Sequence, residues 1–199
     1  MMRVHVIHAH PVETSYNRSL FNTVVETLGE RGHQVDALNL YDEQFDAVLS
    51  RAERLGYHDV PGNLTAAVKP YVDRLLAAEA LVFVHPVWNY GYPAVLKGYF
   101  DRIFLPGVSF TMDKGEDRGV LKPMLRNISK VAFVTTYGGN RWRTMLMGDP
   151  PRRLARRWAW VTFRTRRPPT YLALYDMNNN GPDRLKAFVD KIRTEISQF

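Results

Sequence analysis

Four short apolar runs limit the folds open to this chain more than any other feature. Residues 3–8, 80–85, 130–136 and 169–175 are nearly continuous stretches of apolar and β-branched residues, each of single-strand length. Such runs are typical of parallel sheets, in which helices cover both faces of every strand. A further strand is expected at 34–40.

Segments with helical periodicity lie between these runs. In the first, Leu20, Val24 and Leu28 share one face, and Gly32 ends the segment. The pattern predicts five helices, at 18–31, 63–79, 94–104, 151–163 and 182–198. Five strands alternating with five helices indicate a doubly wound α/β sandwich of three layers, in one domain over residues 1–199. The polar segment 41–62 has no clear period and is expected to be a loop.

Composition excludes several kinds of chemistry. The chain has no cysteine, so a disulfide, a catalytic thiolate and a cysteine-based zinc site are all impossible, and no metal site is expected. The apolar start is too short for a signal-peptide core, and no run reaches the ~20 residues of a membrane span. A cytoplasmic location is therefore expected.

The turn after the first strand carries the first candidate site. It contains His10 and Ser15-Tyr16-Asn17 but no glycine, so both the dinucleotide fingerprint and the P-loop are absent. Hydroxyl, amide and imidazole groups ahead of a helix N-terminus suit a phosphate or pyrophosphate. The alternative is purely structural: Ser15 caps the helix and His10 packs against the strand end.

Residues 85–102 have the sequence HPVWNYGYPAVLKGYFDR. Together with the turn after the first strand, they form a pattern specific enough to indicate a known family. They resemble the segment after the third strand in the flavodoxin-like NAD(P)H:quinone oxidoreductases. Further similarities to that family are found at Asn39-Leu40-Tyr41, at Gly107-Val108-Ser109-Phe110 and at Thr135-Thr136-Tyr137-Gly138-Gly139. The resemblance implies a five-stranded parallel sheet in the order 2-1-3-4-5.

The resemblance also implies a function, a cofactor and site residues. The function is hydride transfer by a ping-pong mechanism from NADH or NADPH, through bound FMN or FAD, to quinones or similar acceptors, in a homodimer. Tyr137 and Arg141 are the catalytic candidates, and Phe110 and Trp142 are expected to wall the acceptor pocket. The expected cofactor contacts are His10, Ser15, Tyr16, Asn17, Pro86, Val87, Trp88, Asn89, Tyr90, Thr136, Gly138 and Gly139. Trp88 and Tyr90 could instead be core aromatics.

One departure from the family limits this transfer of roles. Mammalian members place a tyrosine and a histidine after the double glycine, whereas this chain has no histidine beyond His85. Either water and backbone groups suffice there, or Arg141 stabilises the reduced ring electrostatically.

Positive charge is concentrated in one segment. The formal net charge is +7, and residues 141–167 contain nine arginines against a single acid, Asp149. Three interpretations stay open: a solvated helix face, a site at Arg141 or Arg143 for the 2′-phosphate of NADPH or another anionic ligand, and docking to an acidic partner or an anionic membrane surface. The last favours a rival function, a regulatory flavodoxin-like module that binds a membrane transporter or an acidic partner through this segment. No nucleic-acid-binding motif accompanies the charge.

Overall fold

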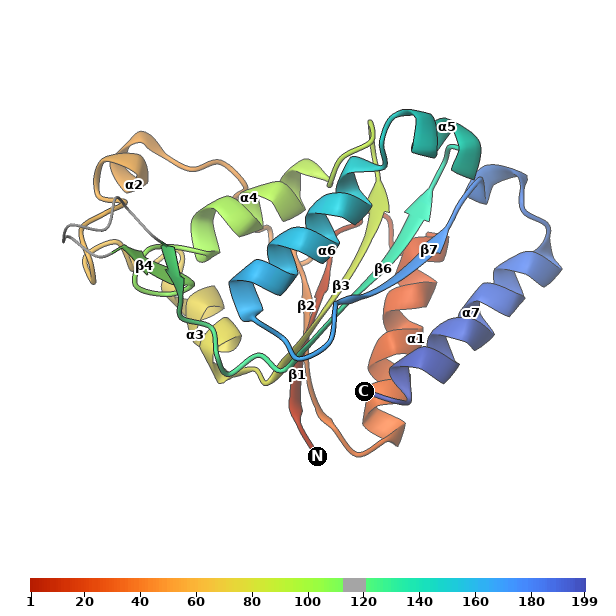
Figure 1. Cartoon of the computed structure of the whole chain (residues 1–199), viewed down its shortest axis with the longest axis horizontal. Coiled ribbons are helices and arrows are strands. Elements are labelled where there is room, and N and C mark those ends of the chain that lie inside the picture. The colour runs from red at the N-terminus through yellow and green to blue at the C-terminus, as the bar shows by residue number, and fades with distance from the viewer. Residues whose placement is uncertain (113–120) are drawn as a thin grey trace.

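A five-stranded parallel sheet forms the centre of the computed structural model, which describes residues 1–112 and 121–199 (Figure 1). Its strands are β1 (Arg3–His8), β2 (Gln34–Asn39), β3 (Ala80–Val87), β6 (Lys130–Tyr137) and β7 (Thr170–Leu174). The order β2-β1-β3-β6-β7 is the expected 2-1-3-4-5 order. The flavodoxin-like topology is therefore confirmed, and every expected strand is found.

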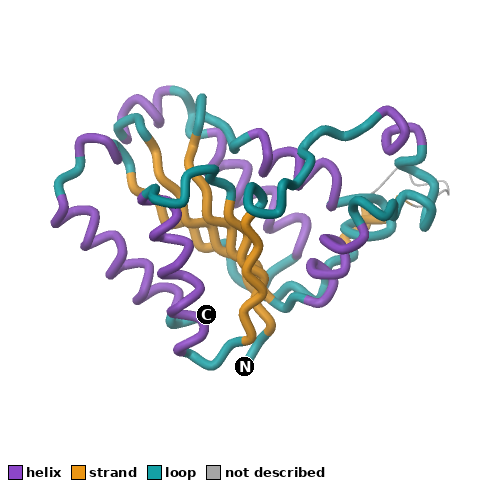
Figure 2. The backbone as a smooth tube through the Cα atoms, turned by 180° about the vertical axis from the view of Figure 1, so that it is seen from behind, coloured by secondary structure: helices purple, strands orange, loops and turns teal. Residues whose placement is uncertain are grey.

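Helices cover both faces of the sheet (Figures 1 and 2). One face packs against α1 (Tyr16–Glu30) and α7 (Pro182–Ile196), through side chains such as Val24 and Ile192. The other packs against α3 (Lys69–Ala77), α4 (Ala94–Ile103) and α6 (Pro150–Phe163). Because both faces are covered, β3 is buried along almost its whole length, which explains its unbroken apolar sequence.

Two predicted helices have different boundaries in the structure. The first begins at Tyr16 because Ser15 is its N-cap, with Oγ accepting a hydrogen bond from the backbone N–H of Arg18. The second was expected from residue 63, but α3 begins only at Lys69 and has a proline in its first turn. Leu64 and Val68 still pack on the core from the preceding turn, so their helical spacing was misleading.

The segment 41–62 is ordered by contacts with α4, and it includes a short helix, α2 (Arg51–Leu55), that was not predicted. Buried Arg102 of α4 forms an ion pair with Glu53 and donates to the carbonyl of Asp46. At Gly98 the helix approaches the backbone of Ala47 so closely that a Cβ would overlap it. Glycine is therefore required where the segment crosses α4.

Further short elements were also missed by the sequence analysis. They are α5 (Arg141–Leu146), the 3-10 turn Met177–Asn179, and the antiparallel pair β4 (Phe110–Met112) and β5 (Leu121–Pro123). Strand β7 lies at one edge of the sheet and follows Pro168 and Pro169. No helix in the described residues is long and apolar enough to cross a membrane.

Candidate functional site

Three neighbouring strand ends build one cavity. A first hollow of about 210 Å³ is lined by the turn after β1, the end of β3 with the residue that follows it, and the end of β6 with the loop after it. Tyr16, Trp88 and Gly138, which come from these three places, all line it. In open α/β sheets ligands bind outside the carboxyl ends of the strands, so the topology puts this hollow where a ligand is expected.

A second hollow of about 440 Å³ adjoins the first and shares Val87, Trp88 and Gly138 with it. Each of the twelve residues expected to contact the cofactor lines one hollow or the other. Three lining residues were missed by the sequence analysis, namely Thr144, Met177 and Asn178. Met177 and Asn178 shortly follow β7, whose carboxyl end faces the same edge, so topology could have indicated them.

In the turn after β1, His10 has a defined orientation. Its Nδ1 accepts a hydrogen bond from the Val12 backbone N–H at 3.1 Å, so the ring proton of neutral His10 is on Nε2. Burial lowers the pKa of His10. The backbone N–H groups of Tyr16 and Asn17 are in the first turn of α1, where a helix leaves donors unpaired. The turn therefore presents donors suited to an anion.

The Tyr16 and Asn17 side chains differ in what they offer. The Tyr16 hydroxyl donates to the Leu185 carbonyl at 2.8 Å, and burial raises its pKa to about 12. Asn17 donates to the Thr136 hydroxyl at 3.3 Å, but its buried Oδ1 has no hydrogen-bond partner in the described residues. An unpaired buried oxygen is costly, so Asn17 has acceptor capacity for a ligand.

The loop after β3 holds its aromatic side chains toward solvent. Trp88 and Gly91 exchange two backbone hydrogen bonds around Asn89 and Tyr90, which have left-handed φ values of 47° and 57°. This is a strained conformation for a tyrosine, and strain of this kind clusters at ligand sites. Trp88 is 40% exposed and Tyr90 36% exposed. The alternative that these two rings belong to the core is thus excluded.

The glycines after β6 are not required by the protein's own packing. A Cβ on Gly138 would meet nothing nearer than Asn178 at 3.8 Å, and one on Gly139 nothing nearer than Thr144 at 3.7 Å. Neither glycine has a left-handed φ. Because the two glycines leave open space beside the two hollows, the loop fits a ligand that lies close against its backbone.

Two uncharged histidines lie in β1 and β3, two of the strands whose ends build the cavity. His8 and His85 are fully buried at the ends of β1 and β3. Burial lowers both pKa values to about 4, and the positive charge of Arg18 adds to the effect at His8. The two imidazoles lie on opposite faces of the sheet, His8 against Phe21 and His85 against Tyr92, and neither lines one of the two hollows.

The expected catalytic and acceptor-pocket residues are more scattered. Tyr137 lines the second hollow, but its hydroxyl is bonded to Asp149 at 2.7 Å and to the Tyr171 hydroxyl at 2.5 Å. Burial raises the pKa of Tyr137 strongly, followed by the effects of Tyr171 and Asp149, so it stays protonated. Arg141 lines a different hollow, and Phe110 and Trp142 line neither of the two. No cluster of potential metal ligands occurs among the described residues.

The fold and the strand-end cavity define a class of protein, and comparison with known families agrees with it. The profile of the family described as flavodoxin-like fold matches residues 2–163. The chain belongs to this family.

Named relatives and solved structures extend the comparison. The chain is 32% identical over 118 residues to an uncharacterised NAD(P)H oxidoreductase of Haemophilus influenzae, covering 59% of this chain and 57% of that protein. It is 29% identical to NAD(P)H dehydrogenase [quinone] 1 of Cavia porcellus, covering 69% and 54%. The matches thus span little more than half the length of these two relatives.

Two solved structures share the fold. An NAD(P)H:quinone oxidoreductase from Methanothermobacter marburgensis superposes with a TM-score of 0.84 at 23% identity, covering 98% of both chains. An FMN-dependent NADH-azoreductase from Bacillus anthracis, solved in complex with FMN, gives a TM-score of 0.75 at 17% identity, covering 100% and 99%.

Proposed function

We propose that this protein is a flavin-dependent oxidoreductase that takes reducing equivalents from NADH or NADPH and delivers them to quinones or similar flat acceptors. The observation that carries the proposal is the gathering of Tyr16, Trp88 and Gly138 around one cavity. The names of the two oxidoreductase relatives support the same activity.

The two hollows suit the two parts of a flavin nucleotide. The first hollow would hold the phosphate, through the α1 N-terminus and His10 Nε2. The second would hold the ring, between the backbone of Gly138 and Gly139 and the exposed side of the loop at Trp88. The flavin supplies the two-electron carrier between nicotinamide and quinone. Because donor and acceptor would enter by the same mouth, ping-pong kinetics are expected.

Tyr137 and Arg141 have distinct places in this proposal. Tyr137 is a positioning residue, since its hydroxyl ties the loop after β6 to Asp149 and Tyr171. Arg141, on the far side of that loop, adds positive charge near the site. Neither residue is assigned a proton transfer, because the Tyr137 hydroxyl is bonded to Asp149 and Tyr171 and Arg141 does not line the second hollow.

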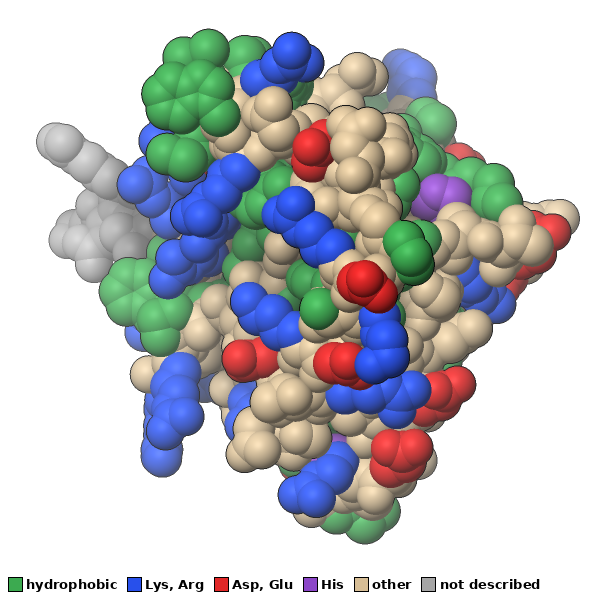
Figure 3. Space-filling view, turned by 90° about the vertical axis from the view of Figure 1, so that its right-hand side faces the viewer, with side chains coloured by type: hydrophobic (Ala, Val, Ile, Leu, Met, Phe, Trp, Pro, Cys, Tyr) green, Lys and Arg blue, Asp and Glu red, His purple; other side chains and the backbone are tan. Residues whose placement is uncertain are grey.

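A second subunit would complete the acceptor pocket. Apolar side chains of α5 are unusually exposed, with Trp142 at 73% and Leu146 at 77%. Hydrophobic side chains also gather beside Lys and Arg at the upper edge of the face in Figure 3. Burying such a patch in a homodimer is favourable, and it would bring Trp142 toward a partner's site.

Purified protein provides the test. It should show flavin absorbance that NADH or NADPH bleaches without oxygen and a benzoquinone restores, and mass spectrometry of the released cofactor should separate FMN from FAD. Protein that is colourless and cannot be reconstituted with either flavin rejects the proposal.

A pair of variants ties the result to the cavity. Gly138→Ala places a methyl group beside both hollows, so it should weaken flavin binding about tenfold or more, by the ~1–3 kcal/mol cost of overpacking. Gly29→Ala is the matched control, since a Cβ there meets nothing within 4 Å. Equal flavin affinity in the two variants would contradict the placement.

A further inference from the structure

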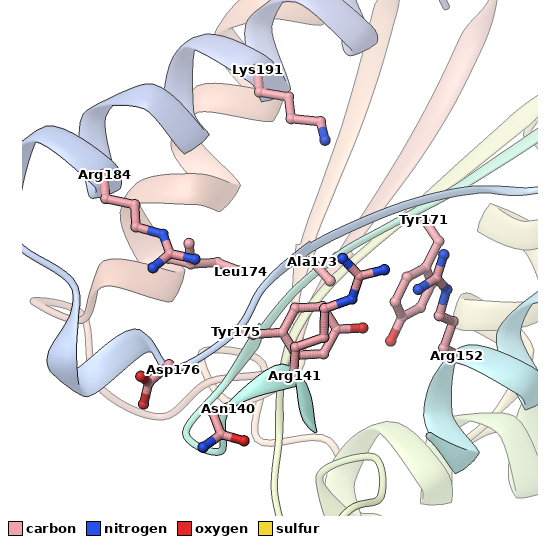
Figure 4. Close-up of a pocket in the computed structure, with 10 residues that line it drawn as sticks. All are labelled: Asn140, Arg141, Arg152, Tyr171, Ala173, Leu174, Tyr175, Asp176, Arg184 and Lys191. Atoms are coloured by element: carbon pink, nitrogen blue, oxygen red, sulfur yellow. The ribbon is translucent and has the colours of Figure 1, made fainter. Parts of the chain in front are cut away.

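The largest of the described hollows lies away from the proposed flavin site, at the β7 edge of the sheet. This edge hollow has a volume of about 510 Å³. Four cations line it: Arg141 of α5, Arg152 of α6, and Arg184 and Lys191 of α7 (Figure 4). Arg184 and Lys191 are seven residues apart, which puts them on the same face of α7. The four charges thus converge from three separate helices.

These four cations are not neutralised by ion pairs among the described residues. Within the described part of the chain, no carboxylate forms an ion pair with any of the four. Asp176 is the one acid lining the hollow, and its Oδ1 accepts a hydrogen bond from Asn179. The hollow therefore has an excess of positive charge, which favours an anionic ligand.

Arg152 is held in place before any ligand arrives. Its guanidinium carbon lies 5.8 Å from the centre of the Tyr171 ring, and the Tyr171 hydroxyl is bonded to that of Tyr137. An arginine fixed in this way loses little side-chain entropy on binding. A guanidinium also matches the oxygens of a phosphate group in pairs.

The edge hollow is separated from the second hollow only by the loop after β6. Gly139 lines the second hollow and the next residue, Asn140, lines the edge hollow. The backbone N–H of Asp176 donates to the Gly139 carbonyl at 3.0 Å, which joins the two walls. A long ligand with one end at the flavin can therefore lie across this loop and place its other end among the cations.

We propose that the edge hollow binds the 2′-phosphate of NADPH through Arg141, Arg152, Arg184 and Lys191, and that it makes the protein prefer NADPH to NADH. This inference rests on the proposed function, because it takes the nicotinamide to be at the flavin. NADPH and NADH differ only in that phosphate, and a hollow lined by four cations against the single acid Asp176 favours the phosphorylated form. Arg143, an alternative candidate from the sequence, does not line the hollow.

A binding experiment tests the site without turnover. Calorimetry on the purified protein, as isolated with its cofactor, should show 2′,5′-ADP binding at least tenfold more tightly than 5′-ADP, and the difference should shrink with added salt. The double variant Arg152→Gln, Arg184→Gln should abolish the difference. In Arg156→Gln, which neutralises an exposed arginine of α6 outside the hollow, the difference should be unchanged.

Kinetics provide the second readout. The ratio of kcat/KM for NADPH to that for NADH should exceed ten and should fall roughly tenfold for each single variant, Arg152→Gln or Arg184→Gln, through KM rather than kcat. Equal binding of 2′,5′-ADP and 5′-ADP overturns the inference even if quinone reduction is observed. Absent NAD(P)H oxidation would reject the proposed function, while the calorimetry would still decide whether the edge hollow recognises the phosphate.

Discussion

Replacing Tyr137 with phenylalanine should destabilise the protein by about 2–4 kcal/mol. The ring stays, so its stacking on Tyr175 at 4.5 Å is kept, but two hydrogen bonds are lost. The bond to the buried carboxylate of Asp149, at 2.7 Å, is of the charged kind, worth about 1.5–3 kcal/mol, and the bond to Tyr171 is worth about 0.5–1.5 kcal/mol. For a chain of this size the loss corresponds to a fall in Tm of roughly 4–15 °C.

The assay is urea unfolding of flavin-free protein followed by circular dichroism, because a bound cofactor would add its own stabilisation. Tyr57→Phe is the matched control. The Tyr57 hydroxyl forms no hydrogen bond within the described residues, so this variant should lose little stability. Tyr175 donates to the same carboxylate at 2.9 Å, so the Tyr137→Phe and Tyr175→Phe effects should not be additive. A loss below about 0.5 kcal/mol, or strict additivity, would refute the reasoning.

Two further predictions concern the buried histidines and the crossing of α4. Burial keeps the pKa values of His8 and His85 near 4 in the folded protein, whereas the pKa of an unfolded histidine is ~6.5. Between these two pH values the unfolded chain therefore binds more protons than the folded protein. The free energy of unfolding should thus fall as pH drops from about 6.5 to 4, less steeply in His85→Gln; a flat profile over this range would contradict the assignment. Gly98→Ala should cost several kcal/mol in urea unfolding, because its Cβ would overlap the Ala47 carbonyl, whereas in Gly29→Ala the stability should be unchanged or slightly higher; equal stabilities would rule out this close approach.

The sheet was predictable because each strand is covered on both faces, and a strand that is buried throughout has a continuous run of apolar residues. The strand-end cavity followed from topology once the loops were matched to a family. Elements that depend on contacts between distant residues have no such local sequence pattern. Helix α2 is held by Arg102, about fifty residues away along the chain, and α5 has too few buried residues to show a period.

The edge hollow could not be predicted from the sequence either. Arg184 and Lys191 belong to an ordinary amphipathic helix whose polar positions could face any direction. Their convergence with Arg152 depends on how α6 and α7 are placed beside β7, which spacing along one helix does not reveal. The concentration of arginines was plain in the sequence, but the choice of Arg141 over Arg143 required the structure.

The exposed edge of β7 also affects how copies of this protein associate at high concentration. An edge strand offers unpaired backbone groups on which another chain can build, which is a common start of aggregation. Here the strand has only five residues, Pro168 and Pro169 precede it, and arginines occupy positions 164, 166 and 167. Proline removes donors and like charges repel a second copy, so the segment discourages polymerisation along the sheet.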